Sequence, residues 1–175
     1  MDKATIIFEV EGMLALLKME LESFAALMGA GLHRKAGHSQ YYAAYDACCA
    51  LLLTKGIKVE RHEGAQSMIS LHFVKSGLLP RMTAAKLNQL MGQRHAVDYH
   101  AAVDIGYDEV AESHAWLIDF IGQTLRLIGE TGLAGRKSLD AVRHALQQAS
   151  KIPPKGAASL HEPLPKRTSA SPKRR

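Results

Sequence analysis

The sequence predicts an all-α protein: a single-domain, up-and-down bundle of four to six helices. Three observations favour this fold. Apolar residues recur every three or four positions along most of the first 150 residues, as they do on the buried face of an amphipathic helix. The 47% of residues that are hydrophobic are mainly Ala, Leu and Met, which favour helix, and only 6% are aromatic. A chain of 175 residues is also long enough for one domain with a substantial core.

The first helix is expected from about Ala4 to Met28, with Gly12 as its weakest point. Its buried stripe consists of Ile6, Ile7, Val10, Leu14, Leu17, Leu21, Phe24 and Leu27. The glycine-rich segment that follows reads as a loop. Ser39 is a suitable N-cap for a second helix, and Gly56 ends that helix.

Glycine and proline mark the next boundary. A third helix is expected over about 64–75, stopped by Gly77 and Pro80. Further helices are expected over about 83–99, 108–129 and 136–149. The helical domain therefore covers residues 1–150, and we expect residues 151–175 to form a separate tail.

The basic charge of the chain is concentrated in this tail. Residues 151–175 hold seven of the 22 Lys and Arg residues and one of the 17 acids, so residues 1–150 carry fifteen basic and sixteen acidic side chains. Proline, serine and basic residues with little to bury predict disorder. The final segment "PKRTSASPKRR" has two interpretations: a solvated end, or an arm that binds nucleic-acid phosphates. Its basic residues are Lys166, Arg167, Lys173, Arg174 and Arg175.

Several features indicate a cytoplasmic protein with neither metal nor cofactor. Cys48 and Cys49 are helical neighbours that cannot readily bridge each other, and they read as small core residues in a reducing compartment. Glu9 and Glu11 interrupt any signal-peptide core, and no apolar run approaches the roughly 20 residues that span a membrane. The phosphate-binding glycine loops are absent from the sequence, and its histidines lack partners at metal-ligand spacing. His114 is expected to be buried and hydrogen-bonded.

The second helix carries an aromatic stripe that includes Tyr41 and Tyr45, with Tyr42 beside it. We expect this stripe to pack in the core, with its hydroxyl groups at the edge of the bundle. The alternative is a platform on which a nucleic-acid base stacks, which requires exposed rings.

The segment "RHAVDYH", residues 94–100, is the strongest functional candidate. Arg94 and Asp98 lie on the same helical stripe as Leu87, Leu90 and Met91, and an arginine on such a face needs a partner. One interpretation is an ion pair between Arg94 and Asp98; the other is a guanidinium positioned to bind a phosphate. His100 points about 120° away from Arg94 on a continuous helix. The two side chains converge only if the helix ends near Tyr99, or across a dimer interface.

Four segments in consistent order resemble the HEPN superfamily (higher eukaryotes and prokaryotes nucleotide-binding). They are "YYAAYDACCALLLTKGI", "HEGAQSMISLHFVKSGLLP", "RHAVDY" and "YDEVAESHAWLIDFI". Together they cover about residues 39–121. The match is greatest to a prokaryotic branch often encoded beside minimal nucleotidyltransferases.

The resemblance implies a metal-independent endoribonuclease of the toxin or defence type, acting as a homodimer on RNA. Its signature, an arginine followed after four to six residues by a histidine, falls on Arg94 and His100, which would be catalytic. His95, Asp98 and Tyr99 would support them, and a minimal nucleotidyltransferase would be the antitoxin. Some members carry a tyrosine two residues after the histidine, where this sequence has Ala102. The alternatives are a non-catalytic HEPN module that binds a nucleotide or a partner transferase, and a purely structural interaction domain.

Overall fold

The computed structural model describes residues 1–59, 61–99 and 105–153. Every regular element in these ranges is helical, which confirms the predicted all-α bundle. In chain order they are α1 (Lys3–Gly29), α2 (His33–Leu53), α3 (His62–Ile69), the π-helical η1 (Ser70–Val74), α4 (Thr83–Tyr99), α5 (Tyr107–Ala111), α6 (His114–Thr131) and α7 (Arg136–Ala149). Of the predicted tail, 151–175, residues 154–175 lie outside the described residues. No helix within the described ranges is long and apolar enough to cross a membrane.

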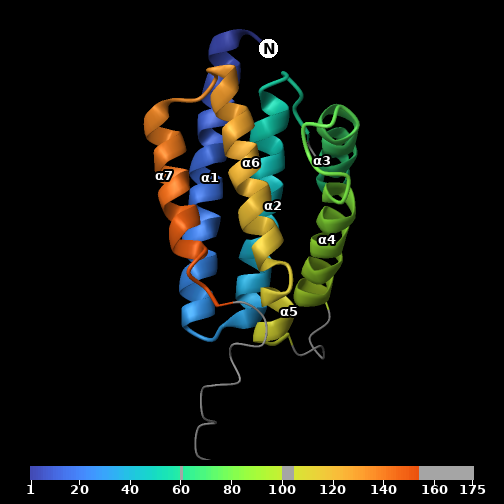
Figure 1. Cartoon of the computed structure of the whole chain (residues 1–175), viewed down its shortest axis with the longest axis vertical. Helices are drawn as coiled ribbons and strands as arrows, with labels where there is room; N and C mark the ends of the chain where they lie inside the picture. The colour runs from blue at the N-terminus through green and yellow to red at the C-terminus, as the bar shows by residue number, and fades with distance from the viewer. Residues whose placement is uncertain (60, 100–104, 154–175) are drawn as a thin grey trace, which may run out of the picture.

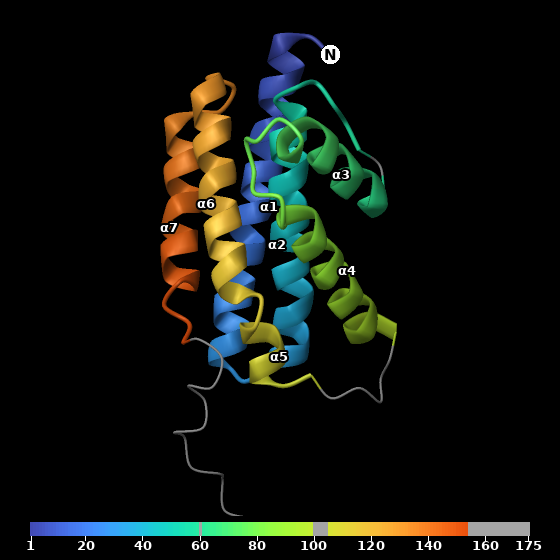
Figure 2. The ribbon, with the colours of Figure 1, turned by 45° about the vertical axis from the view of Figure 1, so that its right-hand side comes forward.

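Four long helices run side by side along the molecule. Figure 1 shows α1, α2, α6 and α7 aligned with the long axis, with α2 between α1 and α4. Turning the molecule shows that α4 crosses α2 obliquely and leans away from the bundle toward its C-terminal end (Figure 2). The short helix α5 closes the same end of the bundle.

Five of the eight residues of the apolar stripe predicted for the first helix are buried, and Ile6, Ile7 and Leu27 are half-buried. The fully buried side chains of α1 include Val10, Leu14, Leu17, Leu21 and Phe24. Asp2 caps the helix, because its Oδ1 accepts a hydrogen bond of 2.9 Å from the Thr5 amide. Periodicity therefore located this helix to within a residue at each end.

The second helix begins at His33, so the prediction of a loop up to an N-cap at Ser39 was wrong. The connection is shorter because Gly31 adopts a left-handed conformation with φ of 72°, and the Leu32 amide donates to the Leu27 carbonyl at 2.9 Å. The chain has thus already reversed at Gly31. The segment after it contains Ala36 and Gly37, which are small enough to be buried against neighbouring helices. The helix ends at Leu53, three residues before the predicted end at Gly56, and Gly56 closes the turn that follows with a φ of 72°.

The single helix predicted over 108–129 is divided into α5 and α6, a second correction. Two glutamine side chains from other helices stabilise the division. Gln40 Nε2 donates to the Val110 carbonyl at 3.0 Å, and Gln93 Nε2 donates to the Glu109 carbonyl at 3.3 Å. In an unbroken helix both carbonyls would accept from amides four residues later. The break leaves no unpaired carbonyl at these two positions, because tertiary contacts replace the local ones.

The third predicted helix, 64–75, is α3 followed by η1. The Lys75 amide donates to the Ser70 carbonyl at 3.0 Å, five residues earlier, which is the spacing of a π-helix. The helices predicted over 83–99 and 136–149 coincide with α4 and α7.

Candidate functional site

Arg94, the residue on which the functional hypothesis depends, packs against two tyrosines of α2. It is half-buried near the end of α4, where that helix leans away from α2. Its guanidinium carbon lies 5.7 Å from the ring centroid of Tyr41 and 5.7 Å from that of Tyr42. A cation at this distance from a ring face is attracted by about 0.5–2 kcal/mol, depending on its exposure. The contact holds the guanidinium in one place on the α2 surface.

The tyrosines form a continuous aromatic cluster under Arg94. The rings of Tyr41 and Tyr42 meet edge-on at 5.3 Å, those of Tyr41 and Tyr45 stack at 6.3 Å, and the His38 imidazole lies 4.6 Å from the Tyr42 ring. Tyr41 is buried, as expected for core packing, whereas Tyr42 and Tyr45 are half-buried. The guanidinium of Arg94 therefore lies on a surface of packed aromatic rings.

Burial raises the pKa of Tyr41 to about 12, although the charge of Arg94 opposes the rise. The phenol is therefore neutral at physiological pH. Tyr41 serves as a ring surface and not as a proton donor or acceptor in acid–base chemistry near pH 7.

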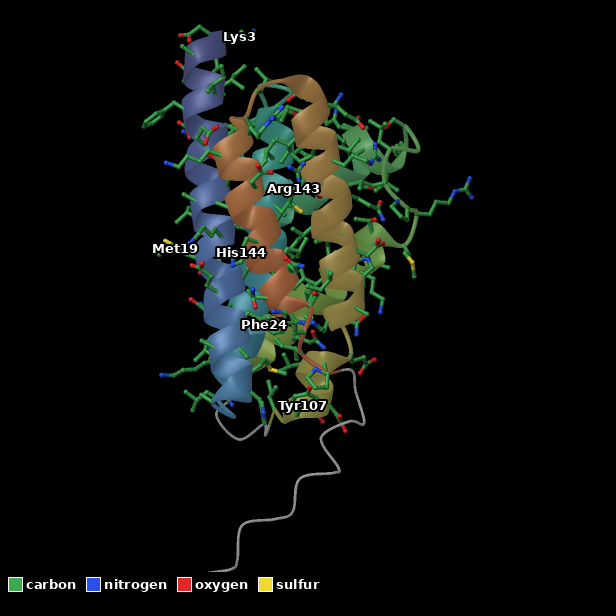
Figure 3. The ribbon with its side chains drawn as sticks, turned by 60° about the vertical axis from the view of Figure 1, so that its left-hand side comes forward. Lys3, Met19, Phe24, Tyr107, Arg143 and His144 are labelled. Carbon is green, nitrogen blue, oxygen red and sulfur yellow. The ribbon has the colours of Figure 1, made fainter. Side chains whose placement is uncertain are left out.

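The chain leading to the basic tail passes the same end of the bundle. The Tyr107 hydroxyl on α5 donates to the Pro153 carbonyl at 2.5 Å, and the His33 imidazole lies edge-on to the Tyr107 ring at 5.5 Å. Figure 3 shows Tyr107 at this end of the molecule. The bond from Gln93 to the α5 carbonyl ties the residue before Arg94 to the same region. Pro153, the last described residue, is thus held at the end of the bundle to which Gln93 is also tied.

The remaining predicted site residues are placed only in part. His95 is exposed on α4 directly after Arg94. Asp98 and Tyr99 belong to the last turn of α4, but their side chains lie outside what the structure describes. His100 and the basic tail residues Lys166, Arg167, Lys173, Arg174 and Arg175 also lie outside the described residues. The pairing of Arg94 with Asp98 and its convergence with His100 therefore stay predictions.

The contact of Arg94 with Tyr41 and Tyr42 was missed from the sequence. The sequence analysis identified each partner separately: the arginine on an apolar stripe of one helix, and the tyrosines on a stripe of another. A tyrosine stripe and an arginine far apart in the chain give no indication that their helices are neighbours.

His114 was correctly expected to be buried, but the expectation of a hydrogen-bonded imidazole was wrong. Neither ring nitrogen has a hydrogen-bond partner among the described residues. The Ala149 carbonyl lies near enough to favour the charged form slightly, without hydrogen-bond geometry. Burial dominates and lowers the pKa of His114. The imidazole packs instead on the Phe24 ring, with centroids 5.2 Å apart.

The buried cysteines are free thiols, in agreement with their interpretation as core residues. Burial raises the pKa of Cys49 to about 11, so this thiol is not a reactive nucleophile at neutral pH. Within the described ranges, no three His, Cys, Asp or Glu side chains are grouped as a metal site requires.

Sequence comparisons give this chain relatives but no defined family. It matches no protein-family model. It is 39% identical over 79 residues to a UPF0332 protein of Pyrococcus horikoshii, a match covering 45% of this chain and 56% of that protein. A protein of Methanocaldococcus jannaschii named "Putative toxin" is 29% identical over 105 residues, covering 60% of this chain and 77% of its own length. A second protein with that name in the same organism is 28% identical over 101 residues, covering 58% of this chain and 69% of its own length.

The chain thus spans little more than half the length of the Pyrococcus relative. The relatives' names indicate a toxin-like family. A specific reaction does not follow from them.

Proposed function

We propose that this protein is an endoribonuclease toxin of the HEPN type, with Arg94 and His100 as its catalytic residues. The observation that carries the proposal is the position of Arg94. Two aromatic rings lie 5.7 Å from its guanidinium carbon and hold it against α2, and a guanidinium carries its N–H donors in a fixed planar fork. Such a preorganised donor set suits a phosphate. The toxin names of the relatives and the HEPN-like segment order agree with this function.

The proposed reaction is cleavage of the RNA backbone by its own 2′-hydroxyl. The 2′-oxygen bonds to the adjacent phosphorus while the bond from phosphorus to the 5′-oxygen of the next nucleotide breaks, which leaves a cyclic phosphate and a 5′-hydroxyl. His100 takes the proton from the 2′-hydroxyl or gives one to the leaving oxygen. Arg94 stabilises the negative charge that develops on the phosphoryl oxygens. His95, Asp98 and Tyr99 support these groups from the same helix.

Two further elements complete the proposal. Pairing of two copies through their α4 ends would bring Arg94 and His100 from both chains to one cleft, which removes the need for them to share a helix face. The tail would hold RNA near this cleft through the five basic residues of its final segment, since Pro153, the last described residue, lies beside α5. A minimal nucleotidyltransferase is the proposed antitoxin.

A second candidate function is favoured by the same contact. Arg94 links α4 to α2 within one subunit, so its role would be to fix these helices as the surface of a non-catalytic module that binds a nucleotide or a partner transferase. In that case the contact of Arg94 with Tyr41 and Tyr42 only stabilises the packing of α4 on α2.

An RNA-cleavage assay in EDTA separates the two functions. Arg94→Ala and His100→Ala should each reduce the cleavage rate by about 10²- to 10⁴-fold, the usual contribution of a positioned acid–base or charge-stabilising group. Arg94→Lys, which keeps the charge but loses the planar donors, should remain strongly impaired. Arg81→Ala is the matched control, because Arg81 is an exposed arginine before α4 begins.

The circular dichroism spectrum and melting temperature of each variant show whether it is folded. Folded variants of Arg94 and His100 that cleave RNA at the wild-type rate would refute the ribonuclease. Absence of cleavage by the wild-type protein, combined with tight binding to a nucleotidyltransferase, would establish the module instead.

A further inference from the structure

The first helix has a second apolar stripe, on the side opposite the core. Phe8 is 78% exposed, Met19 59% and Met1 54%. They belong to an outer stripe whose members follow one another at alternating spacings of four and three residues and are all exposed: Met1, Thr5, Phe8, Gly12, Ala15, Met19, Glu22 and Ala26. This is the spacing at which one helix presents a seam to another helix. The inner face of α1 is already used by the core, so the outer stripe requires a separate explanation.

None of the residues that the structure describes covers the outer stripe. Figure 3 shows Met19 at the outer edge of α1, on the side away from α7. Four charged residues of α1, namely Glu9, Glu11, Lys18 and Glu22, have partners within the subunit. Glu9 pairs with Lys58 at 2.7 Å, and Lys18 pairs with Glu22 at 2.7 Å. The Glu11 carboxylate accepts from the Gly135 amide at 2.5 Å. A partner on this stripe therefore has to match apolar surface and does not have to supply charges.

We propose that the outer stripe binds the outer stripe of a second copy of this chain, with the two α1 helices antiparallel. In the register centred between Gly12 and Ala15, every member of the stripe meets another member. Phe8 faces Met19, Gly12 faces Ala15, Met1 faces Ala26 and Thr5 faces Glu22, and each pair occurs twice by symmetry. This inference goes beyond the proposed ribonuclease and does not depend on it.

The sizes of the facing side chains favour a second copy of this chain over an unrelated protein as the partner. The two large side chains, Phe8 and Met19, face each other, and the flexible thioether of methionine adapts to an aromatic ring. The small residues Gly12 and Ala15 meet at the centre, where they allow the two backbones to approach. A Cβ added at Gly12 would contact nothing within 4 Å, so this position is open in the isolated subunit. The single charged member, Glu22, faces the polar Thr5 and stays paired with Lys18 of its own subunit.

The area of the stripe suits a dimer of modest stability. The exposed parts of Met1, Phe8, Met19 and the adjacent Leu16 amount to on the order of 450 Å² per subunit, taking about 200 Å² for each large side chain. Both subunits together, with the small residues added, reach about the 1,000 Å² that a specific interface needs.

The proposed interface leaves the Arg94 region accessible. Figure 2 shows α1 and α4 on different sides of α2, and Arg94 belongs to the α4 side. Pairing through α1 can therefore coexist with the α4 pairing invoked for catalysis. A test that reports only on α1 keeps the two proposals separate.

Cysteine cross-linking tests both the contact and its register. Phe8→Cys and Met19→Cys proteins are purified separately, oxidised alone and oxidised as a mixture. The mixture should give a disulfide-linked dimer, whereas each variant alone should not, because in this register position 8 of one copy lies opposite position 19 of the other. The wild type is the background control, since Cys48 and Cys49 are buried. Efficient cross-linking of the Phe8→Cys protein with itself would indicate parallel helices and overturn the proposal.

Sedimentation of a charged variant tests the same surface without cysteines. Ala15→Glu places two carboxylates at the centre of the interface and should halve the molecular mass found for the wild type. Ala115→Glu, the same change at an exposed helical position of α6, should leave the mass unchanged. RNA cleavage by the Ala15→Glu variant should persist if the ribonuclease proposal is correct. A wild type that sediments as a monomer, or an Ala15→Glu variant with unchanged mass, would mean that another partner or solvent covers the stripe.

Discussion

Asp46 carries a carboxyl group in the interior of the bundle and supplies the sharpest stability prediction. It lies in the middle of α2, and only 6% of its surface is exposed. Loss of hydration raises the pKa of Asp46 from 3.8 to about 7, and the negative charge of Glu20 on α1 adds to the rise. Around neutral pH the protein therefore holds a buried acid at the midpoint of its titration.

The sign and size of the effect follow from the two pKa values. Between about pH 4 and pH 7 the folded protein binds a proton at Asp46 that the unfolded chain has released, so stability falls as the pH rises through this window. Above pH 7 the destabilisation is complete. A difference of about three pKa units corresponds to roughly 4 kcal/mol at 1.36 kcal/mol per unit, and relaxation around the buried charge reduces this to about 2–4 kcal/mol.

Asp46→Asn removes the charge at nearly constant shape. At pH 8 the free energy of unfolding of this variant should exceed that of the wild type by about 2–4 kcal/mol, and at pH 4 the difference should fall below about 1 kcal/mol. Urea denaturation followed by far-UV circular dichroism measures both. Asp140→Asn is the control, because that carboxylate is exposed and pairs with Arg143 on the surface, where the pair contributes no more than about 1 kcal/mol. A gain in stability that is equal at pH 4 and pH 8, or a loss at pH 8, would refute the reasoning.

Three other substitutions test contacts between helices. Glu11→Gln weakens the acceptor that binds the Gly135 amide and the Ser138 hydroxyl at the start of α7; it should cost about 1–2 kcal/mol and speed amide exchange in α7, so unchanged exchange there would contradict the contact. Gln40→Leu leaves the Val110 carbonyl unpaired in a buried position and should lower the free energy of unfolding by about 1–3 kcal/mol, more than Gln93→Leu, whose bond is exposed; the reverse order would be inconsistent with the division of α5 from α6. The imidazole of His114 should titrate below 6.5 in an NMR experiment because it is buried. Since its folded-state pKa is depressed, His114 should make the protein less stable as the pH falls below about 6.5, and His114→Phe should abolish that loss.

Much of the fold was predictable because it depends on neighbours along the chain. The three- to four-residue spacing of Val10, Leu14, Leu17 and Leu21 defines the buried face of α1 whatever packs against it. Glycine in a left-handed conformation ends a helix through local hydrogen bonds, so Gly56 could be recognised as a boundary. The bounds of α4 and α7 were likewise predicted from periodicity.

Part of the candidate site was also predictable from the sequence. Arg94 lies on an apolar stripe, and a charged side chain at such a position needs a partner. The identity of the partners was not visible. Arg94 rests on Tyr41 and Tyr42, more than 50 positions earlier in the chain, because α4 packs beside α2 in the fold. A sequence pattern reports which residues share a face of one helix, and it carries no information on which face of another helix they meet.

By itself the sequence determined that this chain forms a bundle of helices, and where most of those helices begin and end. It also identified Arg94 as a charged residue on an otherwise apolar helical stripe. The tertiary structure decided the rest. Only the packing of α2 among its neighbours placed Asp46 away from water, and only Gln40 and Gln93 allowed α5 to separate from α6. The physical reason is common to these cases. Burial and hydrogen bonds between helices depend on distances that the fold creates, whereas periodicity and capping act within a few residues of each other.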